Sequence, residues 1–121
     1  MRNKNSEGHN FSNDEIQKVW EKGRIIPGYD PAIFRRDHCG AWIKRDLYGI
    51  SSENLSMGWE IDHIKPLAKN GIDEMSNLQP LQWENNREKS DHYPSWDCLV
   101  TIIGDKNIYT SPHKDLRLSD F

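Results

Sequence analysis

The sequence has few hydrophobic residues and no long apolar run. Only 35% of its 121 residues are hydrophobic, and its mean hydropathy is -0.90, so we do not expect a large core. No segment approaches the roughly 20 apolar residues that a transmembrane helix needs, and residues 1–10 lack the apolar stretch of a signal peptide. We therefore expect one small domain in the cytoplasm, with no membrane attachment.

Cysteine is scarce, with Cys39 and Cys98 far apart in the chain. In a cytosolic protein two such cysteines favour small buried thiols, and one disulfide is the alternative.

The sequence also lacks the excess of positive charge that is typical of proteins that bind nucleic acid. The formal net charge is -3 and the pI is near 5.9, which argues mildly against such a partner. A local cluster still suffices to bind phosphate, and basic residues gather in the middle of the chain: Arg35, Arg36, Lys44, Arg45, Lys65, Lys69, Arg87 and Lys89.

The two ends of the chain carry simple local patterns. Residues 1–11 are polar and predict a flexible N-terminal arm. Ser12 followed by Glu15 fits a capping box, and Ile16, Val19 and Trp20 recur at helical spacing, so a helix is expected over residues 13–22. Near the C-terminus, two β-branched runs at residues 98–103 and 108–110 flank a turn and predict a hairpin.

The central stretch, residues 58–91, predicts a strand, a loop, a second strand and a short helix. Asp62 and His63 follow the first strand, Asn77 precedes the second, and Asn86 lies on the helix. Such a unit can bring these four polar side chains together. We expect the rest of the chain to be organised around it.

These residue types suit the hydrolysis of a phosphodiester. Histidine is the natural base at neutral pH, so we assign His63 to the activation of water. Asp62 and Asn86 offer hard oxygen ligands, which favour Mg²⁺ or Mn²⁺. We expect Asn77 to hold the loop backbone and orient the imidazole, and the predicted nucleic-acid contacts are Lys65, Arg87 and Lys89.

The motif resembles the HNH endonuclease, or ββα-metal, family. The likeness rests on Asp62-His63-Ile64, Pro66, Asn77-Leu78 and Asn86-Arg87-Glu88-Lys89. It implies DNA as the substrate and a divalent metal (Mg²⁺, Mn²⁺ or Ni²⁺) as the cofactor, with His63 and Asn77 as catalytic residues and Asp62 and Asn86 as metal ligands. The expected fold is α+β: a single domain over residues 12–121, built around a ββα unit at 58–91, with a flanking N-terminal helix and a C-terminal β-hairpin.

One departure from the family concerns zinc. Many relatives brace this unit with a structural zinc held by two Cys-x-x-Cys pairs, and the corresponding positions here are Arg36, Cys39, Gln82 and Asn85. Only one of them is a cysteine, and a tetrahedral site needs four good ligands. No structural zinc is therefore expected.

Two other functions remain open from the sequence. The first is a catalytically inactive ββα module that binds nucleic acid or a protein, which the acidic net charge favours. The second is a zinc site made of His38, Cys39, His63 and His92, whose spacing matches no familiar ligand pattern. A homodimer or a larger protein partner is also possible, with the C-terminal hairpin as a contact edge.

Overall fold

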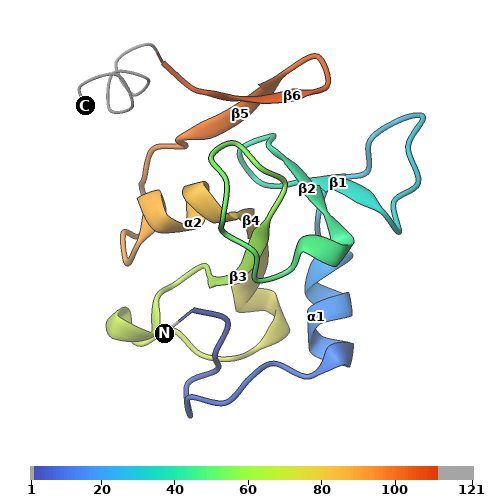
Figure 1. Cartoon of the computed structure of the whole chain (residues 1–121). Coiled ribbons are helices and arrows are strands. Elements are labelled where there is room, and N and C mark those ends of the chain that lie inside the picture. The colour runs from blue at the N-terminus through green and yellow to red at the C-terminus, as the bar shows by residue number, and fades with distance from the viewer. Residues whose placement is uncertain (1, 112–121) are drawn as a thin grey trace.

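The computed structural model describes residues 2–111, which form two α-helices and three two-stranded antiparallel sheets (Figure 1). The elements in chain order are α1 (Asn13–Trp20), β1 (Phe34–Arg36), β2 (Trp42–Lys44), β3 (Trp59–His63), β4 (Leu78–Gln82), α2 (Trp83–Lys89), β5 (Val100–Ile103) and β6 (Lys106–Tyr109). The predicted mixture of helices and strands in a small fold is confirmed. Neither helix in the described part of the chain is long and apolar enough to cross a bilayer.

Helix α1 begins at the predicted capping box. Ser12 Oγ accepts a hydrogen bond from Glu15 N at 3.1 Å, and the Glu15 carboxylate accepts one from Ser12 N at 2.9 Å. The helix ends at Trp20, two residues before the predicted end. Gly23 N bonds back to Trp20 O there, which turns the chain away from the helix axis.

The main core lies between α1 and the β3–β4 pair. It consists of buried side chains from the N-terminal arm, α1 and three strands: Phe11, Ile16, Val19, Trp20, Ile43, Trp59, Ile61 and Leu78. The rings of Trp20 and Trp59 are 5.3 Å apart. Two buried tryptophans supply a large apolar area, which offsets the small number of aliphatic residues.

Strands β3 and β4 and helix α2 follow one another with short connections. Trp59 pairs with Gln82 and His63 pairs with Leu78, so the two strands are aligned along their whole length. Gln82 also caps α2, since its Oε1 accepts from Glu84 N at 2.8 Å and Asn85 N at 3.1 Å. The helix therefore begins directly where β4 ends, and it packs against both strands.

The two cysteines form a disulfide, so the prediction of reduced, buried thiols is wrong. Cys39 and Cys98 are 59 residues apart in sequence, but their Cα atoms are separated by 5.7 Å. They meet because β5 lies beside the loop before β2, where Thr101 Oγ1 donates to Cys39 O at 2.9 Å. The bond excludes Cys39 from the alternative zinc site, and it weighs against the predicted cytoplasmic location, where thiols are kept reduced.

A buried carboxylate occupies the region in which the zinc-bracing positions converge. Asp37 Oδ1 accepts from Cys39 N and Ala41 N, and Asp37 Oδ2 accepts from Gln82 N and Asn85 Nδ2, all at 2.9–3.0 Å. Asp37 is 1% exposed. These four hydrogen bonds join the loop before β2 to the start of α2.

Candidate active site

A pocket of about 340 Å³ lies at the end of β3 and brings three of the four predicted residues together. Asp62, His63 and Asn86 all line it, with Ser90 one helical turn beyond Asn86. Arg2 of the N-terminal arm lines the same pocket, which we call the catalytic pocket. Asn77, the fourth predicted residue, lies beside it in the loop between the strands.

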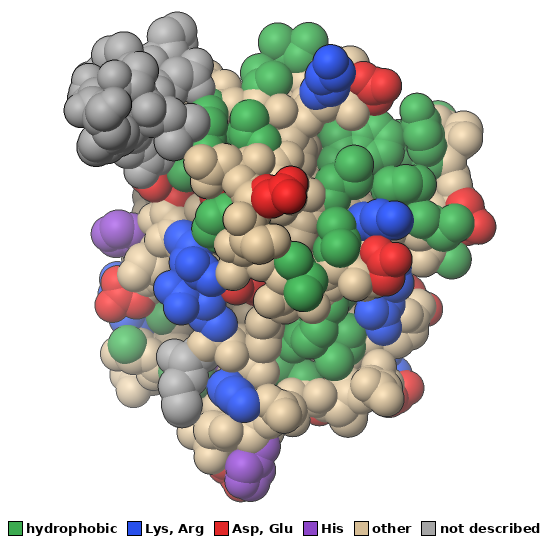
Figure 2. Space-filling view, in the orientation of Figure 1, with side chains coloured by type: hydrophobic (Ala, Val, Ile, Leu, Met, Phe, Trp, Pro, Cys, Tyr) green, Lys and Arg blue, Asp and Glu red, His purple; other side chains and the backbone are tan. Residues whose placement is uncertain are grey.

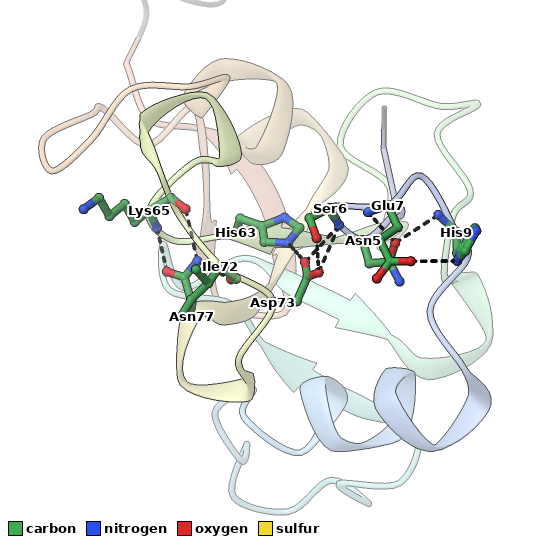
Figure 3. Close-up of polar contacts among 9 residues, drawn as sticks. All are labelled: Asn5, Ser6, Glu7, His9, His63, Lys65, Ile72, Asp73 and Asn77. Atoms are coloured by element: carbon green, nitrogen blue, oxygen red, sulfur yellow. Dashed lines mark hydrogen bonds and ion pairs between the residues drawn. The ribbon is translucent and has the colours of Figure 1, made fainter.

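His63 is the last residue of β3, and its side chain is 11% exposed. Its Nε2 lies 2.9 Å from Asp73 Oδ1 (Figure 3). Its ring is 6.1 Å from that of Phe11. An ionised carboxylate can only accept a hydrogen bond, so this contact assigns the imidazole proton to Nε2. Nδ1 is then the nitrogen with a free lone pair.

Asp73, which sequence reasoning missed, is itself held by the N-terminal arm. Its carboxylate accepts from Ser6 N at 3.0 and 3.1 Å and from Ser6 Oγ (Figure 3). Although burial acts to raise it, these hydrogen bonds and the one from His63 lower the pKa of Asp73 below its ordinary value. Residues 2–11, for which we predict a flexible arm, thus contact the loop that holds the histidine.

The same arm also covers the free edge of β3. Asn3 Oδ1 accepts a hydrogen bond from Ile61 N at 2.8 Å. This backbone group points away from β4, so the arm satisfies a donor that the two-stranded sheet leaves open. No sequence signal links residues 3 and 6 to the strand, because 58 positions separate Asn3 from Ile61.

Asp62 faces α2, on the side of β3 opposite to His63. Its side chain is 6% exposed, and it accepts from Gln79 Nε2 at 3.0 Å and from Lys89 Nζ at 3.2 Å. Burial raises the pKa of Asp62, while the hydrogen bond from Gln79 and the charge of Lys89 act to lower it. Strand alternation thus directs the two neighbouring side chains to opposite faces of β3, and both residues line the pocket at the end of the strand.

Lys89 does not occupy the surface position that a phosphate contact requires. Its side chain is 1% exposed. Besides Asp62, its ammonium group donates to His63 O at 3.1 Å. A fixed positive charge therefore lies between the carboxylate and the backbone of the histidine.

A buried glutamate orients Asn86. Asn86 Nδ2 donates to Glu60 Oε1 at 2.9 Å, and Glu60 is 2% exposed. Since the carboxylate only accepts, the amide nitrogen must face it, which leaves the amide oxygen as the ligand atom on the other side. Sequence reasoning missed Glu60, although its position two residues before Asp62 on a strand predicts the same face.

Arg87 remains exposed but is partly restrained. Its Nη2 donates to Glu60 Oε2 at 3.1 Å, and its guanidinium lies 5.2 Å from the ring centre of Trp83. Positively charged side-chain surface is visible over α2 in Figure 2, and Arg87 is the exposed cation of this helix. Arg87 thus adds an exposed positive charge to the helix that carries Asn86, although the whole chain carries a net charge of -3.

Asn77 clamps the backbone of the loop between β3 and β4. Its Oδ1 accepts from Lys65 N at 2.8 Å, and its Nδ2 donates to Lys65 O at 3.0 Å and Ile72 O at 2.9 Å (Figure 3). Gly71 completes this loop, because a Cβ there would lie 1.7 Å from Lys65 O. The Lys65 side chain points away from the clamp and is exposed.

The oxygen atoms of Asp62 and Asn86 fit a hard divalent cation. An ionised carboxylate has about four lone-pair positions, of which Gln79 and Lys89 use two. Mg²⁺ takes one or two protein ligands and completes its shell with waters and phosphate oxygens. No group of three or more His, Cys, Asp or Glu side chains within residues 2–111 forms a metal cluster, so any ion here would rest on this sparse donor set.

Comparison with known proteins identifies the central segment. Residues 38–92 match the family model for HNH endonuclease. The matched segment contains β2, β3, β4 and α2 together with all four predicted site residues. No curated protein and no solved structure gave a significant match.

Proposed function

We propose that this chain, in which residues 38–92 match the family model for HNH endonuclease, is a metal-dependent nuclease that hydrolyses phosphodiester bonds of DNA. One observation supports this most directly: a single pocket is lined by an imidazole, a carboxylate and an amide from Asp62, His63 and Asn86. A base beside two hard oxygen ligands is the combination that a phosphodiesterase needs.

In this proposal His63 is the general base. Its Nδ1 takes a proton from the attacking water, since Nε2 already donates to Asp73. Asp73 acts as a positioning residue: it fixes the tautomer and the ring orientation, and its negative charge stabilises the imidazolium that forms. A carboxylate has the same two roles behind the histidine of a catalytic triad.

Asp62 and Asn86 would hold the divalent ion, for which Mg²⁺, Mn²⁺ and Ni²⁺ are the candidates. When bound, the ion supplies positive charge to the phosphorane and to the leaving oxygen. Glu60 keeps the amide oxygen of Asn86 turned toward the pocket, and Lys89 partly neutralises Asp62.

Exposed cations on the rim would contact the DNA backbone. We assign this role to Arg87 and Lys65, which are exposed and directly neighbour in sequence two residues that line the pocket, Asn86 and Pro66. Asn77 contributes indirectly by fixing the loop that carries Lys65 and Asp73. Ser90 also lines the pocket and is placed to hold a water near Asn86.

A plasmid-nicking assay tests the proposal. Supercoiled plasmid with Mg²⁺ should become nicked or linear, EDTA should prevent this, and His63→Ala should reduce the rate by about 10²–10⁴-fold. His92→Ala is a matched control, because it too follows an aspartate but is exposed. Intact plasmid with Mg²⁺, Mn²⁺ and Ni²⁺ would refute nuclease activity.

The alternative is a module that binds nucleic acid or a protein without cleaving it. One observation favours it: each Asp62 oxygen already accepts a hydrogen bond from a protein donor, and one donor is a buried cation. If the chain is such a module, the wild type and His63→Ala should bind DNA with the same affinity, and neither protein should cut plasmid. Metal-dependent nicking by the wild type would exclude it.

A further inference from the structure

A second pocket, of about 190 Å³, is lined by three cations. Lys22 and Arg24 come from the segment after α1, and Arg36 is the last residue of β1. We call it the basic pocket. All three residues precede the segment that matches the HNH endonuclease family, and Arg36 is two positions before its start.

The two arginines are held directly opposite each other. Arg24 N donates to Arg36 O at 2.7 Å, and Arg36 N donates to Arg24 O at 2.9 Å, which forms an isolated antiparallel bridge. Residues paired in this way point their side chains to the same face. Like charges directly opposite destabilise a pair of strands, so an anion between them would remove a repulsion that the fold otherwise retains.

No carboxylate in residues 2–111 forms an ion pair with these cations. None of Lys22, Arg24 and Arg36 takes part in an ion pair among the described residues. The acidic group at the pocket is Asp37, and its two oxygens already accept four N–H donors from elsewhere. The basic pocket therefore keeps a local positive charge in a chain whose net charge is negative.

Backbone carbonyl groups hold the cations in place without using up their donors. Arg24 Nη2 donates to His38 O at 3.0 Å, and Arg36 Nε donates to Gly40 O at 3.2 Å. Lys22 Nζ donates to Met75 O at 2.6 Å and to Leu78 O. Each guanidinium is thus oriented by one N–H group and has others left for a ligand, which suits the geometry of a phosphate.

A hydrogen bond links one lining residue of each pocket. Gln79 lines the basic pocket, and its Nε2 donates to the Asp62 carboxylate, which lines the catalytic pocket, at 3.0 Å. A ligand with anionic groups at regular intervals would reach both pockets at once. A nucleic-acid strand has this chemistry, whereas a single small anion would fill only one of them.

We propose that the basic pocket binds a phosphate of the DNA backbone that neighbours the cleaved phosphate, with Arg24 and Arg36 gripping one phosphate from two sides. This inference rests on DNA as the substrate of the proposed function. It assigns to the segment after α1 the role of fixing where along the strand the cleaved bond lies.

The test compares DNA binding by wild type, Arg24→Gln, Arg36→Gln and the double variant. Binding to a fluorescein-labelled duplex is measured by anisotropy in EDTA over a range of NaCl concentrations. We expect each variant to bind about tenfold more weakly, as for the loss of a charge-assisted hydrogen bond. Log K falls as log [NaCl] rises, and each contacted phosphate contributes about 0.9 to the steepness of this fall. Because both arginines contact the same phosphate, the double variant should reduce the steepness by about 0.9, whereas two separate phosphates would give about 1.8.

Cleavage kinetics and a matched control complete the design. KM should rise in the arginine variants while kcat stays unchanged, since neither side chain touches the reacting atoms. Lys18→Gln removes the same charge from α1, but Lys18 is paired with Asp14 at 3.0 Å and should leave affinity and slope unchanged. Arg24 is exposed, so Arg24→Gln should fold normally. It remains a valid test even if thermal unfolding shows that Arg36→Gln does not fold.

The outcomes separate this inference from the proposed function. Unchanged affinity and slope in Arg24→Gln, with wild type cutting plasmid, would overturn the basic pocket alone. Arginine-dependent binding without cleavage would support the pocket and refute the nuclease. Binding of inorganic phosphate by the arginines with no loss of duplex affinity in the variants would overturn the inference in favour of a free anion, and no duplex binding by wild type would overturn it as well.

Discussion

Replacing Lys89 with methionine should strongly destabilise the protein. It should also leave the Asp62 carboxylate without its counter-ion, so that added Mg²⁺ stabilises the variant. The Lys89 side chain is 1% exposed, and its ammonium group donates to both Asp62 Oδ1 and His63 O. Methionine keeps most of the side-chain volume but removes the charge and both hydrogen bonds. The Asp62 carboxylate would then remain buried without its counter-ion.

The size of the effect follows from this burial. Removing one partner of a buried ion pair costs about 3–5 kcal/mol, because the remaining charge is uncompensated. At an m value of about 1.5 kcal/mol/M, the urea midpoint should fall by roughly 2–3 M. The double variant Asp62→Asn, Lys89→Met lacks the orphaned charge and should recover at least half of the loss.

Urea unfolding followed by the fluorescence of the five tryptophans measures these changes. Lys106→Met, at an exposed position on β6, should shift stability by less than about 0.5 kcal/mol. In Lys89→Met, Mg²⁺ should raise the Tm more than in wild type, since the carboxylate beside Asn86 now lacks its own cation. A Lys89→Met variant as stable as wild type, or one indifferent to Mg²⁺, would refute this reasoning.

Three further predictions concern the arm, the disulfide and the buried carboxylate. Replacing Cys39 and Cys98 with alanine should cost about 4 kcal/mol at most, from the 59-residue separation that the bond spans, measured by urea unfolding. Because hydrogen bonds lower the pKa of Asp73, its ¹³C NMR titration should have a midpoint below 3.8, and Ser6→Ala should raise that midpoint. These contacts therefore stabilise the fold above pH 3.8, and that contribution is lost as the pH falls through the lowered pKa. Asp37→Asn should cost about 3 kcal/mol, since it turns an amide NH₂ group toward two buried N–H donors.

Each of these predictions has a result that would contradict it. Equal midpoints for the cysteine variant and the oxidised wild type would show that the bond does not stabilise the fold. A midpoint for Asp73 at or above 3.8, or one unchanged in Ser6→Ala, would remove the arm from the site. Asp37→Asn within about 0.5 kcal/mol of wild type would mean that the carboxyl group is protonated in the native protein.

The sequence alone determined the features that depend on neighbouring residues. The capping box of α1 needs only Ser12 and Glu15, three positions apart, and the helix starts where they predict. The segment that matches the HNH endonuclease family was found from short motifs around His63 and Asn86, whose spacing is set by two strands and a helix in direct succession. Such signals are readable because a turn, a cap or a strand period involves residues close together in the chain.

The tertiary structure decided which distant residues complete those motifs. Ser6 reaches Asp73 across 67 positions, Arg24 faces Arg36 across a bridge, and Cys39 meets a cysteine 59 positions away. It also placed Lys89 inside the protein, although one lysine on a short helix has no local mark that tells a buried counter-ion from a surface charge. Long-range pairings depend on how α1, the arm and β5 pack against the central strands, and that packing is a property of the whole chain and not of any one segment.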